Sequence, residues 1–486
     1  MHRNNQGQER SITIGRSWSG SGHAGPGSCG GALITASTKL QNNIIGIHVA
    51  AGAGVMVSAM VTYEDLTVID SSNLRSERLS CVTLARKPSH INCRTKLKLS
   101  PIGEWVDSNK VPSAMPFIDN RPNEDPLAIS LLKHSGPLVD EPLGYENAVD
   151  LVQFKIDASI CHGGQRYLTT DEAIQGIDGL DGIDMNTSAG LPYTVHGKRK
   201  RDMIQNGQLV DPYCKLMLES CENCIDNGLD PGVVYTSCCK DELRPIEKVE
   251  SGKTRMIECA PLHYVIAVRK RLGYVASLLH NNVGFGTGIA VGIDPEAMWH
   301  PLMRAAIEFG DRCMCLDFSN FDGRVSPFMI ERAIRMLCEL SGLDVNTTNS
   351  LVMSYTRTRR QLGNLVLHIV GGLPSGCPLT SIIGSIINLC NLYYALTYAL
   401  RTNVQQVNNL VRVLVYGDDV LMILSRKVVS VDISRFVAVL NDLGMVVTGA
   451  TKNEDVSIKP LCDAEFLKRK WRLDGHGLFH PTATSS

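Results

Sequence analysis

The chain has 486 residues, a length sufficient for about three domains. Hydrophobic residues make up 44% and charged residues 20%, a composition typical of a globular protein. The net charge of −1 excludes a global excess of positive charge, so any nucleic-acid surface must come from local clusters of Lys and Arg. The 16 scattered cysteines and the lack of an apolar signal-peptide core predict reduced thiols in a cytosolic setting. No apolar run reaches the roughly 20 residues of a membrane span, so none is expected.

The first unusual segment is "GPGSCGGALI" at 25–34, where glycines surround Cys29. Backbone N–H groups in such a loop can face a developing oxyanion beside a nucleophilic thiolate. His48 follows in "GIHVAAG", but the histidines before Cys29 are only His2 and His23, and His23 lies on the same Gly/Ser-rich loop. Because the base that would activate Cys29 is missing, we expect no peptidase activity from this segment alone.

Two segments in the middle of the chain are rich in charge. "KRKR" at 198–201 fits either a phosphate-contacting patch or a solvated charge run. Residues 240–255 contain five basic and four acidic residues. If that segment folds back on itself, several of its cations can point at one triphosphate, although a salt-bridged surface has the same composition.

The segment "CMCLDFSNFDGRVSP" at 313–327 predicts a short buried strand that ends at Asp317. Asp322 follows, and Gly323 marks a break. Ser326 and Pro327 are typical of the N-cap and first residue of a helix, and apolar residues recur at helical spacing over 328–340.

A glycine-rich loop follows at 371–376, and glycines there let a backbone flex and approach a ligand closely. An apolar helix is expected after it, to about Leu400. Ser375 can cap this helix, contact a ligand, or do both.

The segment "VRVLVYGDDVLMIL" at 411–424 predicts a β-hairpin with Asp418 and Asp419 at its tip. A solvated Gly-Asp turn is the simpler interpretation. If the strand that ends at Asp317 is a neighbour, however, the carboxylates converge, and divalent cations give them a reason to do so. Two such cations can clamp the attacking and leaving oxygens of a phosphoryl transfer.

Seven motifs, in this order, resemble those of the RNA-dependent RNA polymerases of picorna-like positive-strand RNA viruses (dicistrovirus and picornavirus type), over roughly residues 85–480. They are "NTSAGLPY" (186–193), "KDELRPIEKVESGKTRMIE" (240–258), "DFSNFD" (317–322), "GGLPSGCPLTS" (371–381), "YGDD" (416–419), "TGATK" (448–452) and "FLKRKW" (466–471). The resemblance implies an α+β, right-hand polymerase with fingers, palm and a truncated thumb.

The resemblance also implies a role for each matching residue. Catalytic roles fall on Asp317, Asp418, Asp419 and Lys452, and the three aspartates would bind two Mg²⁺ or Mn²⁺ ions. Nucleoside triphosphate binding falls on Lys240, Arg244, Lys248, Arg255, Asp322, Ser375 and Thr380. RNA binding falls on Thr187, Ser188, Gly376, Lys468 and Arg469.

The sequence departs from the family pattern at Gly384. The family usually has an asparagine there, four residues after the threonine, facing the ribose. Either Asn388 or a water takes over this contact, or recognition of the ribose hydroxyl rests on Asp322 and Ser375.

The front of the chain, with Cys29 and His48, resembles the C-terminal part of the chymotrypsin-like cysteine protease encoded before the polymerase in such viruses. The expected division is a partial β-barrel remnant of the protease at 1–65, a linker at 66–84 and the polymerase at 85–486. The chain then reads as a polyprotein fragment.

The predicted function is template-directed RNA synthesis from nucleoside triphosphates, which replicates a positive-strand RNA genome in the host cytoplasm at membrane-associated replication complexes. Expected partners are an RNA template and primer, a viral protein primer and other replication proteins. Three alternatives stay open: a reverse transcriptase, which usually has a bulky residue at the position of Asp322 and lacks the 240–255 segment; a cysteine peptidase fragment; and a non-catalytic RNA-binding protein.

Overall fold

The computed structural model describes the strands between residues 2 and 83 and most of residues 95–483, apart from 99, 102–108, 115–121, 124–125, 135, 161–165, 364 and 451–453. The chain divides into two compact units, Met1–Glu77 and Arg78–Ser486.

In the first unit, the described residues form antiparallel strands. β1 (His2–Arg3) pairs with β2 (Glu9–Arg10). The larger sheet has the order β3-β6-β5-β4, with bounds Ser17–Ser21, Val55–Met60, Ile44–Gly52 and Ala32–Ile34. His48 lies in β5 opposite Ser58. Cys29 lies outside the described residues.

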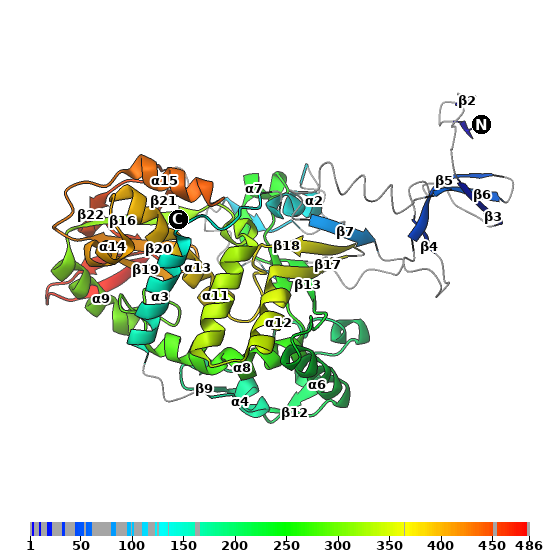
Figure 1. The fold of residues 1–486 in the computed structure, drawn as a ribbon, viewed down its shortest axis with the longest axis horizontal. Helices are drawn as coiled ribbons and strands as arrows, with labels where there is room; N and C mark the ends of the chain where they lie inside the picture. Colours follow the sequence, from blue (N-terminus) through cyan, green and yellow to red (C-terminus); the bar gives the residue numbers. More distant parts are fainter. Residues whose placement is uncertain are drawn as a thin grey trace. The chain divides into compact units, whose positions relative to one another are not determined.

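The second unit is built on a sheet of order β19-β20-β16-β21, with β22 also paired to β16 (Figure 1). The strands are β16 (Arg312–Phe318), β19 (Val411–Tyr416), β20 (Asp419–Leu424), β21 (Val447–Gly449) and β22 (Lys459–Pro460). The predicted hairpin at 411–424 and the predicted strand ending near Asp317 are therefore confirmed, and they are direct neighbours.

Both faces of this sheet are buried, which explains why its strands read as nearly continuous apolar runs. Successive side chains of a strand point to opposite faces. Met314 and Leu316 accordingly join the large core with the helix α13, whereas Cys313 and Cys315 join a smaller core with Trp299 of α9 (Pro295–Phe309).

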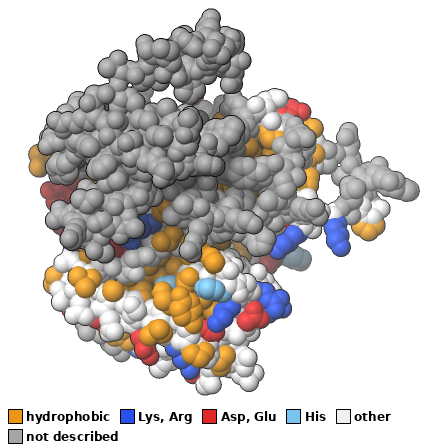
Figure 2. All heavy atoms as spheres, turned by 90° about the vertical axis from the view of Figure 1, so that its right-hand side faces the viewer, with side chains coloured by type: hydrophobic (Ala, Val, Ile, Leu, Met, Phe, Trp, Pro, Cys, Tyr) orange, Lys and Arg blue, Asp and Glu red, His pale blue; other side chains and the backbone are white. Residues whose placement is uncertain are grey.

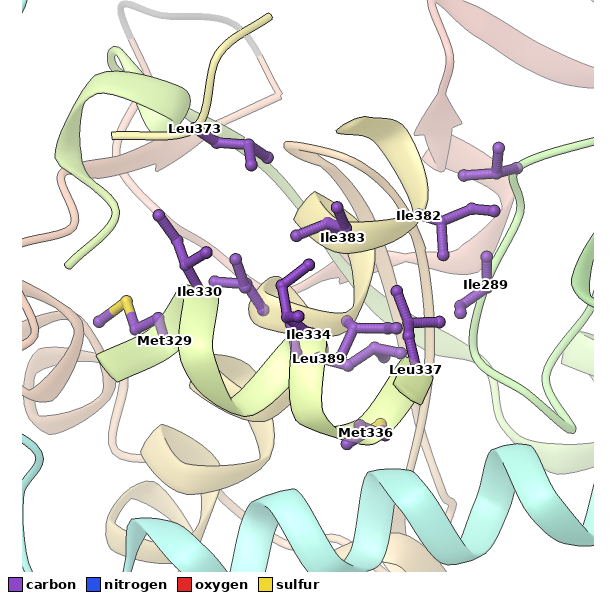
Figure 3. Packing of buried hydrophobic residues seen from close by; sticks show 14 of the residues in the cluster. Ile289, Met329, Ile330, Ile334, Met336, Leu337, Leu373, Ile382, Ile383 and Leu389 are labelled. Atoms are coloured by element: carbon purple, nitrogen blue, oxygen red, sulfur yellow. The ribbon is translucent and has the colours of Figure 1, made fainter. Parts of the chain in front are cut away.

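The helix α13 (Thr380–Ala399) crosses the centre of the large core. Figure 3 shows Ile383 and Leu389 of α13 on the side of Ile330 and Ile334 of α11 (Pro327–Leu340), whereas Ile382 lies nearer Ile289. α11 begins as predicted, with Ser326 as its N-cap and Pro327 as its first residue. α13 begins at Thr380 with Leu379 as its N-cap, so Ser375 does not cap it. α13 is long and apolar enough to cross a membrane by composition, but 89% of its most apolar window is buried inside the protein, as is usual for a core helix.

A second five-stranded sheet has the order β15-β13-β17-β18-β7. Its strands are β15 (Met256–Cys259), β13 (Val234–Cys239), β17 (Arg357–Leu362), β18 (Leu365–Val370) and β7 (Leu79–Thr83). β7 falls within the segment at 66–84 that the sequence analysis assigned to a linker, and the compact unit begins at Arg78.

The remaining elements surround these sheets. The helices are α2 (Pro126–Leu131), η3 (Leu132–His134), α3 (Tyr145–Ser159), α4 (Thr170–Gln175), η4 (Tyr193–His196), α5 (Lys200–Met203), α6 (Pro212–Asp226), α7 (Ile246–Glu250), α8 (Leu262–Asn281), α10 (Phe321–Arg324), α12 (Val345–Thr356), α14 (Val404–Leu410), α15 (Ile433–Asp442) and η5 (Leu461–Asp463). The short strands are β8 (Lys110–Pro112), β9 (Gly176–Ile177), β10 (Leu180–Asp181), β11 (Ile204–Gln205), β12 (Gln208–Leu209), β14 (Leu243–Pro245), β23 (Glu465–Phe466), β24 (Arg469–Leu473) and β25 (Phe479–Ala483).

Figure 2 shows one face of the molecule, on which the described surface carries hydrophobic side chains beside both Lys or Arg and Asp or Glu side chains. Neither charge sign dominates that part of the face, in keeping with the net charge of −1.

Candidate functional site

Three aspartates converge at one end of the central sheet. Leu316 of β16 pairs with Val420 of β20, so Asp317 and Asp419, one position further along each strand, lie at the same end of neighbouring strands. Tyr416 pairs with Asp419, which leaves Gly417 and Asp418 as the two turn residues. Asp418 is exposed, and the other two aspartates are half-buried.

Hydrogen bonds hold two of these carboxylates. The backbone N–H of Phe318 donates to Asp317 Oδ1 at 2.8 Å. The backbone N–H of Leu467 donates to Asp419 Oδ2 at 3.0 Å. Leu467 lies in the turn between β23 and β24, so this hairpin, which carries Lys468 and Arg469, reaches the aspartates.

The carboxylates carry more negative charge than the site readily tolerates. Burial raises the pKa of Asp419 to about 7, and the carboxylates of Asp418 and Asp317 contribute to the increase. Burial also raises the pKa of Asp322 to about 7, with Asp418 and Glu258 contributing. Divalent cations relieve this repulsion, and carboxylate oxygens are the ligands that Mg²⁺ prefers.

Within the described ranges, no three His, Cys, Asp or Glu side chains form a group that could by itself hold a metal ion. A Mg²⁺ ion commonly takes only one or two carboxylates and completes its coordination with water and substrate phosphates. The donor set around Asp317, Asp418 and Asp419 therefore fits ions that bind together with a phosphate substrate.

Three of the cations predicted to bind triphosphate converge on a single carboxylate. Glu242 lies 3.3 Å from Lys240 Nζ, 3.4 Å from Arg244 Nη1 and 3.6 Å from Arg255 Nη1. Arg255 comes close to Glu242 because the segment folds back on itself: the backbone C=O of Arg255 accepts a hydrogen bond from Lys240 N at 2.8 Å. Lys248 instead has an exposed side chain on α7.

Lys133 of η3 belongs to the same region, although sequence reasoning missed it. Burial lowers the pKa of its ammonium group; Glu258 raises it, whereas Arg255 and Arg244 lower it. Its isolated position in "SLLKHSG" gave no signal, because only the tertiary fold brings it near 240–258.

The loop at 371–376 is held by Glu258, another residue that sequence reasoning left without a role. Glu258 Oε2 accepts from Ser375 N at 2.9 Å and from Ser375 Oγ at 2.6 Å, and Arg360 Nη1 lies 3.4 Å from Glu258 Oε1. A Cβ on Gly376 would lie 1.8 Å from the backbone oxygen of Glu258, so only glycine fits there.

Asp322 and the loop are joined through the backbone, since Leu373 N donates to Asp322 O at 2.8 Å. The hydroxyl of Thr380 contacts carbonyl oxygens of its own turn, Cys377 O at 2.7 Å and Pro374 O at 3.1 Å. The two hydroxyls expected at the ribose thus make hydrogen bonds within the protein: Ser375 bonds Glu258, and Thr380 bonds backbone oxygens of the preceding loop and turn.

The structure places Gly384 next to the hairpin turn. A Cβ there would meet Phe321 at 3.6 Å and Gly417 at 3.7 Å, which are ordinary contacts. Asn388, one of the candidates to replace the missing asparagine, donates from Nδ2 to Gly417 O at 2.8 Å.

The region expected at the template entry is exposed at Thr187 and Ser188. Thr187 Oγ1 donates to Asp184 O at 2.9 Å, and Ser188 Oγ accepts from Gly190 N at 3.1 Å. Lys200 of the "KRKR" run is buried and donates to Asp184 O at 3.1 Å, so it contributes to the fold rather than to a surface patch.

Lys452 lies outside the described residues, like Cys29, so the structure does not test the proposed role of either.

Comparison with known proteins matches the chain to one family. The sequence model described as viral RNA-dependent RNA polymerase matches residues 123–486. The genome polyprotein of Human hepatitis A virus genotype IIA (isolate CF-53) is 38% identical over 484 residues, which cover 97% of this chain and 22% of the relative. The genome polyprotein of genotype IIB (isolate SLF88) is 37% identical with the same coverage. The chain therefore spans about a fifth of the length of these relatives.

A solved structure is similar over most of the chain. The Sicinivirus 3Dpol RNA-dependent RNA polymerase superposes with a TM-score of 0.72 and 29% sequence identity, covering 83% of this chain and 84% of that chain.

Proposed function

Since this chain belongs to the family of viral RNA-dependent RNA polymerases, we propose that Asp317, Asp418 and Asp419 are the residues with which it catalyses nucleotidyl transfer. It is the polymerase of a picorna-like virus, homologous to a region of the hepatitis A virus polyprotein. The observation that carries the proposal is the convergence of the three carboxylates at the end of β16 and the tip of the β19–β20 hairpin.

The proposed cofactors are two Mg²⁺ or Mn²⁺ ions held by these aspartates. When bound, such ions stabilise charge on the attacking and leaving oxygens of a phosphoryl transfer. The contribution of the protein is positioning: β16 and β20 fix Asp317 and Asp419 side by side, and Leu467 N orients Asp419.

The proposed triphosphate site is the cation group around Glu242. The phosphates are bound by Lys240, Arg244 and Arg255. Lys248 lies on the path by which the triphosphate enters. In the absence of nucleotide the Glu242 carboxylate offsets the mutual repulsion of the three cations. Lys452 is proposed to protonate the pyrophosphate leaving group.

Recognition of the ribose is proposed to rest on Asp322 with the loop of Ser375 and Thr380. Glu258 fixes this loop at Ser375, and Asp322 is joined to it through Leu373. A hydroxyl donor and acceptor at the 2′ position distinguishes RNA precursors from DNA precursors.

The chain binds an RNA template and nucleoside triphosphates, as its family implies, and acts in replication in the host cytoplasm. For contacts to the RNA we propose Thr187, Ser188, Gly376, Lys468 and Arg469. An RNA primer, a viral protein primer, other replication proteins and membrane-associated replication complexes are further proposed partners and sites.

For the front of the chain we propose a protease remnant at 1–65 that contains Cys29 and His48, a linker, and a polymerase that follows. The support is that genome polyproteins match 97% of the chain, including most of this segment. The chain is expected to cleave no peptide substrate by itself, and a fluorogenic peptide assay checks this. Cleavage that disappears in Cys29→Ala would contradict the proposal.

The experiment that tests the polymerase site is extension of a short RNA primer on an RNA template with Mg²⁺ or Mn²⁺. Asp418→Ala is expected to lower turnover by at least about 10³-fold, roughly 4 kcal/mol of barrier, with the fold intact. Near-normal turnover of this variant would refute the assignment. Incorporation of deoxyribonucleotides in preference to ribonucleotides would favour a reverse transcriptase.

A further inference from the structure

The turn that carries Asp418 is held by two side chains of α13. Gly417 N donates to Ser385 Oγ at 2.9 Å, and Asn388 Nδ2 donates to Gly417 O at 2.8 Å. Because Gly417 and Asp418 are the two turn residues, the N–H and C=O of Gly417 lie outside the strand ladder. α13 therefore satisfies both peptide groups of Gly417, which have no strand partner in the hairpin.

Both side chains are built into the core rather than placed on a surface. Ser385 and Asn388 are each 0% exposed. Ser385 donates its own proton to Ser381 O at 2.7 Å, so the oxygen lone pair is available to Gly417 N. Asn388 Oδ1 is buried and has no hydrogen-bond partner among the described residues, so the bond of Nδ2 to Gly417 O is the hydrogen bond that its side chain makes there.

Gly417 depends on these contacts for its position. Its φ is +61°, a conformation that glycine adopts readily, and a Cβ placed on it would meet nothing within 4 Å. The strand pair Tyr416–Asp419 closes the turn, and the two hydrogen bonds from α13 hold the Gly417 peptide within it.

We propose that Ser385 and Asn388 are positioning residues that clamp the Gly417 peptide and thereby hold Asp418 for catalysis. The inference rests on the proposed role of Asp418. Because α13 begins at Thr380, directly after the loop of Ser375, the clamp also connects the nucleotide-binding loop to the catalytic hairpin through one rigid helix. Asn388 is consequently committed to the hairpin and does not read the ribose.

Ser385→Ala and Asn388→Ala test the clamp in the full chain, each with a matched control. Ser354→Ala removes another buried hydroxyl, on α12, which bonds Tyr264 Oη of α8 at 2.7 Å. Asn391→Ala removes another fully buried asparagine of α13, which accepts from Tyr145 Oη at 2.8 Å away from the hairpin.

The first measurement is hydrogen exchange of the peptide that spans Gly417 in metal-free protein. Ser385→Ala removes the acceptor of Gly417 N–H, so exchange at this amide is expected to be at least about tenfold faster. The control Ser354→Ala is expected to keep the wild-type rate there. A wild-type rate in Ser385→Ala would overturn the proposal.

The second measurement separates kcat from KM in primer extension. Both clamp variants are expected to lower kcat by about tenfold or more while the KM for nucleotide stays within about twofold, because Asp418 moves and the triphosphate cations do not. Both are also expected to need more Mg²⁺ for half-maximal rate. The controls lose comparable thermal stability and keep their kcat.

A kcat within about twofold of the matched control would contradict the clamp. If Asn388→Ala fails to fold, Ser385→Ala decides alone, since it deletes one oxygen atom. Absence of extension by the wild-type chain would refute the proposed function, whereas hydrogen exchange at Gly417 would still decide the clamp.

Discussion

At the scale of single residues, two neighbouring arginines of β17 differ in burial because they have different partners. Arg360 is 1% exposed and makes its contacts to Glu258, Thr358 and Gly372. Its neighbour Arg359 points to the other face of β17 and pairs with Asp230 at 2.7 Å near the surface. The two arginines are adjacent in sequence, and only the tertiary structure shows that one of them, Arg360, supports the loop at 371–376.

Arg360→Leu is expected to destabilise the chain by about 3–5 kcal/mol, because it leaves the Glu258 carboxylate buried without its counterion. Arg359→Leu, the matched control, breaks a partly exposed pair and is expected to cost at most about 1 kcal/mol. Urea unfolding of both variants measures the difference. Equal losses in the two would contradict the assigned role of Arg360.

His263 makes stability depend on pH. Its ring is buried, bonds Tyr193 Oη at 2.8 Å, and has a pKa lowered by burial from 6.5 to about 4. In the unfolded chain the ring takes up a proton below pH 6.5 while the folded ring stays neutral. Stability from this group is therefore full above pH 6.5 and is lost as pH falls towards 4, by about 3 kcal/mol at most.

His263→Gln removes the titration, and the fall in free energy of unfolding between pH 6.5 and pH 4 is expected to become smaller than in the wild type. Chemical unfolding at several pH values measures this. His300→Gln, at a half-buried histidine outside the large core, serves as the control. A pH dependence unchanged by His263→Gln would show that the ring is protonated in the folded state.

At the scale of elements, the loop at 371–376 is fixed from two sides. Glu258 of β15 holds Ser375, and the turn after β16 holds Gly372 and Leu373 through Val325 O and Asp322 O, each at 2.8 Å. The loop proposed to bind nucleotide is therefore held on one side by β15 and on the other by α10 and the residue that follows it.

Gly376→Ala is expected to displace this loop, because the added Cβ would lie 1.8 Å from Glu258 O. We expect the KM for nucleotide to rise by about tenfold or more, with a smaller effect on the melting temperature. Gly475→Ala is the control, since a Cβ there meets nothing within 4 Å. Primer extension over a range of nucleotide concentrations measures both, and an unchanged KM in Gly376→Ala would show that the loop adapts.

At the scale of the whole molecule, the second unit begins at Arg78 and so includes the edge strand β7. β7 (Leu79–Thr83) pairs with β18 over five residue pairs, so a polymerase that starts at residue 85 lacks the edge strand of its second sheet. The exposed edge of β18 would then be open to pairing with other chains.

A chain of residues 78–486 is expected to melt within about 2 °C of the full chain, whereas a chain of residues 85–486 is expected to melt at least about 4 °C lower and to aggregate more readily. Calorimetry and light scattering measure the two effects. Identical behaviour of the two truncated chains would indicate that β7 adds nothing to the stability of the unit.

The sequence alone determined the strands and helices that hold the proposed site residues. The hairpin at 411–424, the strand that ends at Asp317 and the helices α11 and α13 follow from local patterns, because apolar periodicity and turn residues act over a few positions. The ordered motifs identified the family and so the reaction.

Only the tertiary structure decided which side chains meet. Lys133 beside 240–258, Glu258 on Ser375, and Asn388 on Gly417 each join segments that are separated in the chain. No local pattern encodes such contacts, since they arise when the sheets and α13 pack together. The same packing buries Lys200 of the basic run and places Asn388 against the turn of the β19–β20 hairpin.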